Sequence, residues 1–132
     1  MLTVTPALAQ ANWKQYIAGS ISSWKQISNT NKGEANIGPA LQAQGPITIG
    51  INASQMQNYV SGVDVPRTCR ASAVDHAVLI VGFGKDANHP KKPYYWKIKN
   101  SWGESWGEQG YYRIMAGVAA CGLATDAVHS KY

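Results

Sequence analysis

Residues 75–102 read DHAVLIVGFGKDANHPKKPYYWKIKNSW and predict a β-hairpin. Two apolar runs, residues 75–82 and 94–102, flank a loop rich in Gly, Asn, Pro and Lys that is centred near position 88. In an antiparallel hairpin the start of the first strand faces the end of the second. His76 and Asn100 are equally far from the loop centre, so they are expected to meet across the ladder. An imidazole beside an amide oxygen is an oriented general base that needs only a nucleophile.

Alternation along the second arm of the hairpin decides which way Asn100 points. One face carries Trp96, Ile98 and Asn100, and the other carries Tyr95, Lys97 and Lys99. The lysine face is expected to be solvated, so Asn100 should point toward the protein interior. A buried amide there needs a hydrogen-bond partner, and the ring of His76 is the nearest candidate. Trp102 and Trp106 follow directly and are expected to shield that contact from water.

The other elements are expected to be short, and most of them are strands. Strands are predicted at residues 21–27, 46–52, 111–115 and 123–128, a helix at 36–44 that ends at Gly45, and a single helical turn at 55–60. Several strands with only short helices predict an α+β, mainly β fold, built as a small antiparallel sheet or barrel. Residues 1–19 carry little periodicity and are expected to form a poorly defined arm before a single domain at 20–132.

Length, composition and charge narrow the class of protein. The 132 residues suffice for one domain with a modest core. Twelve Lys and Arg residues against seven Asp and Glu give a net charge of +5. The basic residues are scattered and form neither a stripe nor a basic helix, so no nucleic-acid partner is expected. No apolar run approaches the ~20 residues that span a bilayer, so no membrane partner is expected either.

The two cysteines, Cys69 and Cys121, leave two interpretations open. They can form a disulfide, which would indicate an oxidising compartment, or they can remain two separate buried thiols. Neither belongs to a CxxC pair, and the three histidines complete no zinc-binding spacing. No metal and no other cofactor is therefore expected.

Four segments carry a resemblance to a known family. VDHAVLIVGFG at residues 74–84 resembles the histidine strand of papain-like cysteine peptidases, and YWKIKNSWGESWGEQGYYRI at 95–114 resembles their asparagine segment. GPITIGINA at 45–53 and CGL at 121–123 also occur in the family's order and spacing. The similarity is greatest to cathepsin L- and F-type members, and it implies the fold of the family's C-terminal, right-hand domain.

The resemblance implies catalytic roles for three residues. His76 matches the catalytic histidine, which forms an ion pair with a cysteine thiolate and later protonates the leaving amine. Asn100 matches the residue that orients this imidazole through a hydrogen bond. Trp102 matches the indole that shields the bond between histidine and asparagine. The resemblance also implies that Cys69 and Cys121 form a disulfide.

The resemblance further places Gly50, Ala77 and Asp126 on the lining of the S2 pocket, which holds the side chain two residues before the cleaved bond. Asp126 matches the floor of this pocket, where an acidic residue allows a basic side chain as well as a hydrophobic one. The small Gly50 and Ala77 would leave room for a large group. We therefore expect a pocket for Leu or Phe and also for Arg or Lys, with a solvated surface aspartate as the alternative for Asp126.

Residues 52–54, Asn-Ala-Ser, form a glycosylation sequon. The sequon lies beside Gly50 of the expected pocket, which suggests a crowded position. Modification of Asn52 is therefore not expected.

The sequence departs from the family at the nucleophile. The left-hand domain of the family carries its cysteine within a Gln-x-x-x-x-Cys-Gly-x-Cys-Trp segment, and nothing in the 132 residues matches this segment. Without a thiolate and its oxyanion donors the chain alone is expected to be inactive. The left-hand domain, in cis or in trans, and a peptide or protein substrate are therefore the expected partners.

Three interpretations follow from this departure. The chain is the right-hand half of a papain-like endopeptidase, or a non-catalytic module that binds a peptide or protein through the inter-domain face, or a structural module unrelated to proteolysis. In each case an apolar cleft wall would be exposed, so a second chain or self-association is expected there. The family and the disulfide together indicate a lysosomal, vacuolar or secreted protein.

Overall fold

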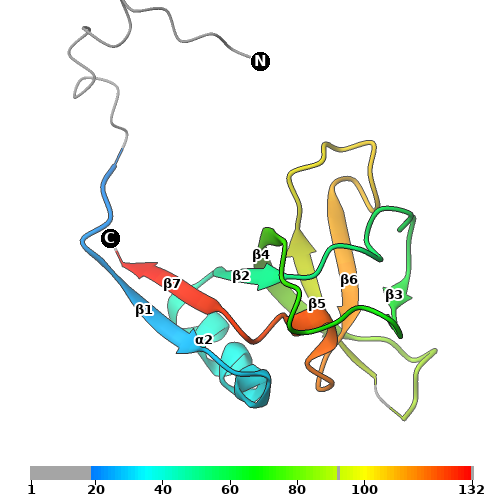
Figure 1. Cartoon of the computed structure of the whole chain (residues 1–132), viewed down its shortest axis with the longest axis horizontal. Coiled ribbons are helices and arrows are strands. Elements are labelled where there is room, and N and C mark those ends of the chain that lie inside the picture. Colours follow the sequence, from blue (N-terminus) through cyan, green and yellow to red (C-terminus); the bar gives the residue numbers. More distant parts are fainter. Residues whose placement is uncertain (1–18, 92, 132) are drawn as a thin grey trace, which may run out of the picture.

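A computed structural model describes residues 19–91 and 93–131 of the chain. A seven-stranded sheet dominates it, which confirms the mainly β fold (Figure 1). The strands are β1 (Ser23–Ser28), β2 (Ile47–Ile51), β3 (Val63–Asp64), β4 (His76–Lys85), β5 (Tyr94–Lys99), β6 (Tyr111–Met115) and β7 (Ala127–Lys131). The helical elements are η2 (Asn31–Asn36), α2 (Ile37–Gln44) and η3 (Ala120–Gly122). Apart from Gly19, the predicted arm at 1–19 lies outside the described residues.

The strands follow one another in the order β1-β7-β2-β4-β5-β6-β3. Figure 1 shows β1, β7 and α2 at one end of this arrangement and β5, β6 and β3 at the other. All neighbouring strands are antiparallel except β3 and β6, which run parallel. These two strands are far apart in the sequence, so no tight hairpin turn forces them to be antiparallel.

The hairpin of β4 and β5 forms, but its register differs from the prediction. Ile80 pairs with Ile98, whereas a loop centred at position 88 would place it opposite Trp96. The loop is centred between positions 89 and 90, which shifts the pairing beside it by three residues, and a β-bulge in β4 reduces this shift to two. Side chains alternate with a period of two, so a shift by two residues keeps His76 and Asn100 on the same face of the sheet.

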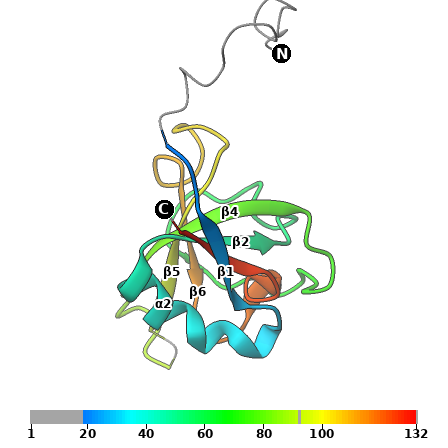
Figure 2. The same ribbon diagram turned by 90° about the vertical axis from the view of Figure 1, so that its left-hand side faces the viewer.

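One apolar core joins the sheet to α2, to the turns after β2 and to the region of η3. From α2, Ile37, Ala40 and Leu41 point into it at helical spacing, and Figure 2 shows α2 and η2 along one side of the strands. The largest fully buried side chains are Tyr112, Ile37, Ile47, Ile49, Ile51, Met56, Ile80, Ile98, Ile114 and Leu123. Gly45 ends α2 with a φ of 94°, as its position in the sequence predicts. In the part of the chain that is described, no helix has the length and apolar character of a membrane span.

Two predicted elements are misplaced. The strand predicted at 123–128 begins only at Ala127, because a turn follows η3. Leu123 has helical backbone angles, with φ of −54° and ψ of −18°, and the N–H of Thr125 donates to the carbonyl of Gly122 at 2.9 Å, which no strand accommodates. Just before this turn, Ala119 and Cys121 have left-handed backbone angles, with φ values of 48° and 55°. The helical turn predicted at 55–60 is a series of turns at residues 54–58.

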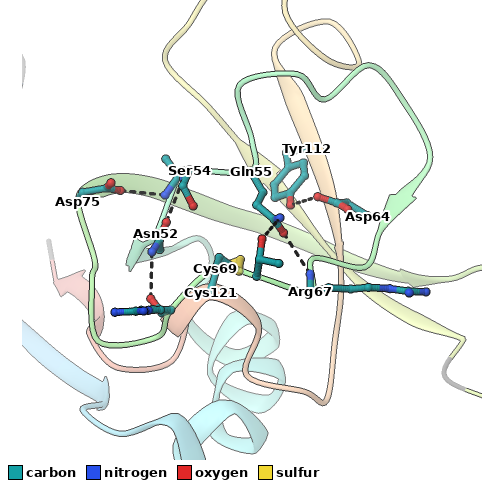
Figure 3. Close-up of a disulfide and its surroundings, with 12 residues drawn as sticks. Asn52, Ser54, Gln55, Asp64, Arg67, Cys69, Asp75, Tyr112 and Cys121 are labelled. Atoms are coloured by element: carbon teal, nitrogen blue, oxygen red, sulfur yellow. Dashed lines mark hydrogen bonds between the residues drawn. A yellow bond between two sulfur atoms is a disulfide. The ribbon is translucent and has the colours of Figure 1, made fainter.

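A disulfide joins Cys121 of η3 to Cys69, 52 residues earlier in the sequence (Figure 3). The pairing is the one that the family resemblance implied, and it rules out two separate thiols. The bond ties the segment that leads into β4 to the segment that leads into β7.

Buried Glu34 holds the loop that precedes η3. Its carboxylate accepts the indole N–H of Trp96 at 2.7 Å and the backbone N–H groups of Gly117, at 2.7 Å, and Ala119. Three charge-assisted hydrogen bonds compensate for the burial of the carboxylate. Glu34 therefore fixes the direction from which the chain enters η3 and Cys121.

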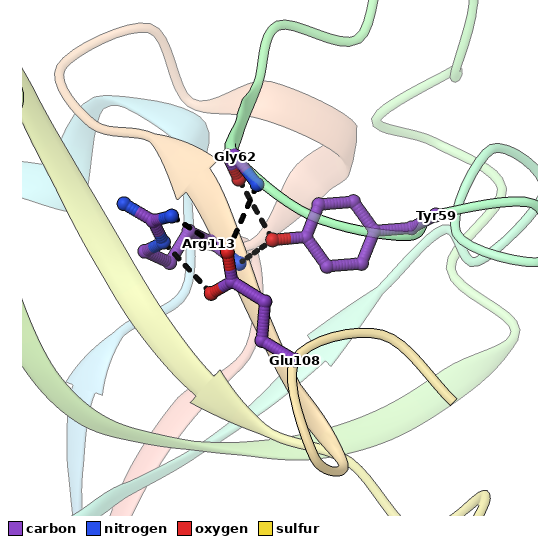
Figure 4. Close-up of polar contacts among 4 residues, drawn as sticks. All are labelled: Tyr59, Gly62, Glu108 and Arg113. Atoms are coloured by element: carbon purple, nitrogen blue, oxygen red, sulfur yellow. Dashed lines mark hydrogen bonds and ion pairs between the residues drawn. The ribbon is translucent and has the colours of Figure 1, made fainter. Parts of the chain in front are cut away.

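A second polar cluster joins β6 to the loop before β3 (Figure 4). Arg113 donates from Nε at 2.8 Å and from a terminal nitrogen at 2.6 Å to the two carboxylate oxygens of Glu108. The backbone N–H of Gly62 donates to the same carboxylate at 2.9 Å, and the hydroxyl of Tyr59 donates to the carbonyl of Gly62 at 2.7 Å. The hydrogen bonds from Arg113 lower the pKa of Glu108 below its ordinary value, although burial acts against them.

Acid is expected to weaken this cluster. The pKa of Glu108 is lower in the folded chain, so the cluster stabilises the fold above the unfolded pKa of about 4.3 and loses this effect as the pH falls through the folded value. The side chains of Arg113 and Glu108 are 27% and 25% exposed, which limits the contribution to about 1 kcal/mol or less. Urea unfolding at pH 7 and pH 3 checks this. The wild type should lose more stability over this interval than Glu108→Gln, and equal losses would contradict the prediction.

Candidate active site

His76 begins β4, and Asn100 follows directly after β5. The Nε2 atom of His76 lies 2.8 Å from Oδ1 of Asn100. The backbone N–H of Ser101 also donates to this oxygen at 2.8 Å, which fixes the orientation of the amide because its nitrogen could not accept that bond. An amide oxygen only accepts hydrogen bonds, so the imidazole carries a proton on Nε2 and its Nδ1 is left for another partner.

The indole ring of Trp102 covers the imidazole, and Trp106 packs against Trp102. The ring of Trp102 stacks on that of His76, with 5.0 Å between centroids and 28° between planes. Trp106 meets Trp102 edge-on at 5.0 Å and 78°, and its indole N–H donates to the carbonyl of Met56 at 3.2 Å. Trp102 itself remains 38% exposed. The imidazole is therefore held by a hydrogen bond at its edge and by a ring on its face.

Gly50, Ala77 and Asp126 lie together on a cavity of about 440 Å³ that His76 also lines. Gly50 pairs with Ala77 across β2 and β4, and its N–H donates to the carbonyl of Asp126 at 2.9 Å. A methyl group at Gly50 would lie 2.7 Å from a methyl carbon of Val74. Glycine therefore keeps this wall of the cavity open.

The cavity also has walls that sequence reasoning missed. Thr48, Val74 and Val128 line it in addition to the expected residues. Thr48 lies two residues before Gly50 on β2, so strand alternation could have identified it. Val128 of β7 pairs with Thr48. Val74 belongs to the loop before β4, and no periodicity in the sequence indicates its position.

The comparisons with known proteins agree with one another. Residues 7–131 match the family described as papain family cysteine protease. Cysteine proteinase 15A of Pisum sativum is 45% identical over 113 residues, which cover 83% of this chain and 30% of the pea protein. Cathepsin F of Drosophila melanogaster is 50% identical over 95 residues, which cover 67% of this chain and 16% of the fly protein.

A solved structure of the digestive procathepsin L 3 from the larval midgut of Tenebrio molitor has the same fold. It superposes with a TM-score of 0.75 at 33% sequence identity, and the match covers 87% of this chain and 36% of that one. The chain thus spans between 16% and 36% of the length of these three relatives.

Proposed function

Because the chain belongs to the papain family of cysteine proteases, we propose that it supplies the histidine and asparagine of a cysteine endopeptidase active site. The observation that carries this proposal is the 2.8 Å contact between Nε2 of His76 and Oδ1 of Asn100, stacked against Trp102. The contact turns the free Nδ1 atom away from Asn100, where a thiolate can meet it. Asn100 acts as the positioning residue and His76 as the catalytic acid and base.

The proposed reaction uses His76 twice. Its imidazolium forms an ion pair with the thiolate, which attacks the scissile carbonyl. The Nδ1 proton then passes to the leaving amine as the thioester forms. Neutral His76 next takes a proton from the water that attacks the thioester, and the thiolate leaves as the acid forms. The carbon–nitrogen bond breaks, one water is consumed, and the imidazole returns to its first state.

The nucleophile has to come from a cysteine other than Cys69 and Cys121. Both cysteine sulfurs of the sequence are joined in the disulfide, so neither can be a thiolate. We propose that a cysteine-bearing left-hand domain, in cis or in trans, provides both the thiolate and the oxyanion donors. The 132 residues alone are then expected to be inactive on peptides.

The surface beside His76 suits such a partner. Val74 and Trp102 remain 40% and 38% exposed, so apolar side chains frame the imidazole and the cavity. A partner domain would cover them, and without one the chain is expected to self-associate through this face. The alternative function is a non-catalytic module that binds a peptide or protein through the same exposed apolar face.

Thiol alkylation separates these two functions. A free cysteine has a pKa of about 8.5 and reacts slowly with iodoacetamide in mild acid, whereas a thiolate paired with imidazolium reacts readily. Adding the chain to a cysteine-bearing left-hand domain at pH 5.5 should accelerate alkylation at least ~10-fold if the pair forms. The Asn100→Ala variant should accelerate it less. Complex formation with no change in the rate would instead support the non-catalytic module.

The cavity predicts a substrate preference. Asp126 lines it together with Gly50 and Ala77, so we propose that it accepts Leu or Phe and, through the carboxyl group of Asp126, also Arg or Lys. In the peptidase assembled with a left-hand domain, peptides with Arg and peptides with Phe two residues before the cleaved bond should both be hydrolysed. The Asp126→Asn variant should lower hydrolysis of the Arg peptide relative to the Phe peptide. A ratio that this substitution leaves unchanged would contradict the assignment.

The disulfide also indicates the cellular compartment of the protein. A bond between Cys69 and Cys121 forms and persists in oxidising surroundings. We therefore propose a lysosomal, vacuolar or secreted location.

A further inference from the structure

The asparagine of the sequon at residues 52–54 is part of the interior. Asn52 is only 6% exposed, and both ends of its amide are occupied (Figure 3). The Nδ2 group donates to the carbonyl of Arg70 at 3.0 Å, and Oδ1 accepts the backbone N–H of Ser54 at 3.0 Å. A glycan on Nδ2 could not fit in this buried position.

The neighbours of Asn52 hold the segment that leads into His76. Ile51 pairs with His76 across β2 and β4, and its carbonyl accepts the N–H of Asp75 at 3.2 Å. The N–H of Ala53 donates to the carboxylate of Asp75 at 2.8 Å. The N–H of Asn52 itself donates to the carbonyl of Cys121 at 2.8 Å. Residues 51–53 therefore bind both the start of β4 and the disulfide region.

The segment between Cys69 and His76 depends on such bonds for its position. Most of residues 70–75 are exposed, so little buried apolar surface holds them. The disulfide fixes one end at Cys69, and Asp75 fixes the other. The amide of Asn52 adds the side-chain bond at Arg70, where the chain leaves the disulfide.

We propose that Asn52 is a positioning residue for His76 and that its sequon is not a modification site. By holding the carbonyl of Arg70, it sets the path that places His76 against Asn100 and Val74 against the cavity. The functional part of this inference rests on the proposed function, because His76 matters for chemistry only if it serves a thiolate. The positioning itself is a property of this chain alone.

Two substitutions separate the amide from the sequon. Asn52→Asp keeps the size of the side chain and its acceptor for Ser54 but removes the donor to Arg70. Ser54→Ala destroys the sequon and leaves every contact of Asn52 in place, because Ser54 contributes its backbone N–H. If Asn52→Asp does not fold, Asn52→Ser retains a short acceptor for the turn and is too short to reach Arg70.

Hydrogen exchange on the chain alone provides the readout. Asn52→Asp should speed exchange at the Nε2–H of His76 and at the amides of Ala73 and Asp75 by ~10-fold or more. The amides of β5 and β6 should be unaffected, and Ser54→Ala should match the wild type throughout. Uniform loss of protection across the sheet, or none at His76, would overturn the inference.

Activity and glycan analysis complete the test. In the assembled peptidase Asn52→Asp should lower kcat, while Ser54→Ala should not, and the secreted wild-type chain should carry no glycan. If the wild type is inactive with every left-hand domain, the proposed function fails, yet the exchange experiment still decides the positioning. A glycan on the folded wild-type chain would overturn the inference.

Discussion

Replacing His76 by alanine is expected to lower kcat/KM of the peptidase assembled from this chain and a left-hand domain by ~10³-fold or more. The variant loses both the cation that stabilises the thiolate and the proton for the leaving amine. Fold stability should change little, because His76 is only half-buried at the start of β4. Steady-state hydrolysis of a fluorogenic peptide, with urea unfolding measured on the same preparations, checks both expectations.

Two further variants serve as references for His76→Ala. His89→Ala lies in the loop at the opposite end of the hairpin and should leave kcat/KM unchanged. Asn100→Ala keeps the imidazole but frees its ring, so its loss should be smaller than that of His76→Ala. Equal activity of His76→Ala and the wild type would remove His76 from the mechanism.

Removing the disulfide is expected to cause the largest loss of stability. The bond closes a loop between residues 52 positions apart, for which the loop-entropy relation gives about 4 kcal/mol, within a usual range of about 2–5 kcal/mol. The double variant Cys69→Ser, Cys121→Ser should lose this amount, which is a large part of the stability of a small domain. Urea unfolding of the wild type and the double variant measures the difference.

The effect of a reductant distinguishes the bond from the packing of its sulfurs. Dithiothreitol should shift the unfolding midpoint of the wild type toward that of the double variant and should leave the double variant unchanged. A double variant as stable as the oxidised wild type would show that this bond adds nothing to the fold. The bond joins the segments that lead to His76 and to Asp126. Its loss should therefore also loosen the walls of the cavity that these two residues line.

Local sequence patterns could predict the hairpin and the faces of its strands that point toward the core. The apolar runs around a Gly- and Pro-rich loop identified β4 and β5, and alternation showed that Asn100 shares a face with Ile98. The register could not be read in the same way, because neither the exact centre of the loop nor the bulge in β4 follows from the apolar pattern. The period of two made this error harmless for the contact between His76 and Asn100.

The features that sequence patterns did not predict depend on residues far away in the sequence. The approach to β7 is bent through left-handed residues that Glu34 and the disulfide hold in place, and the partners of Glu34 lie 62, 83 and 85 residues from it. A lone glutamate in a polar segment gives no sign of such burial. Asn52 is a similar case, because its place beside the expected pocket suggested only a crowded position, while its amide binds Arg70, 18 residues away.

The rate of peptide hydrolysis by the mixed halves tests the central claim most directly. The chain, a cysteine-bearing left-hand domain, and their mixture are each assayed with a fluorogenic peptide that carries Phe or Arg in the S2 position. The account predicts hydrolysis only in the mixture, and its loss when His76→Ala replaces the wild type. A tight complex without hydrolysis, or hydrolysis by the 132-residue chain alone, would contradict it.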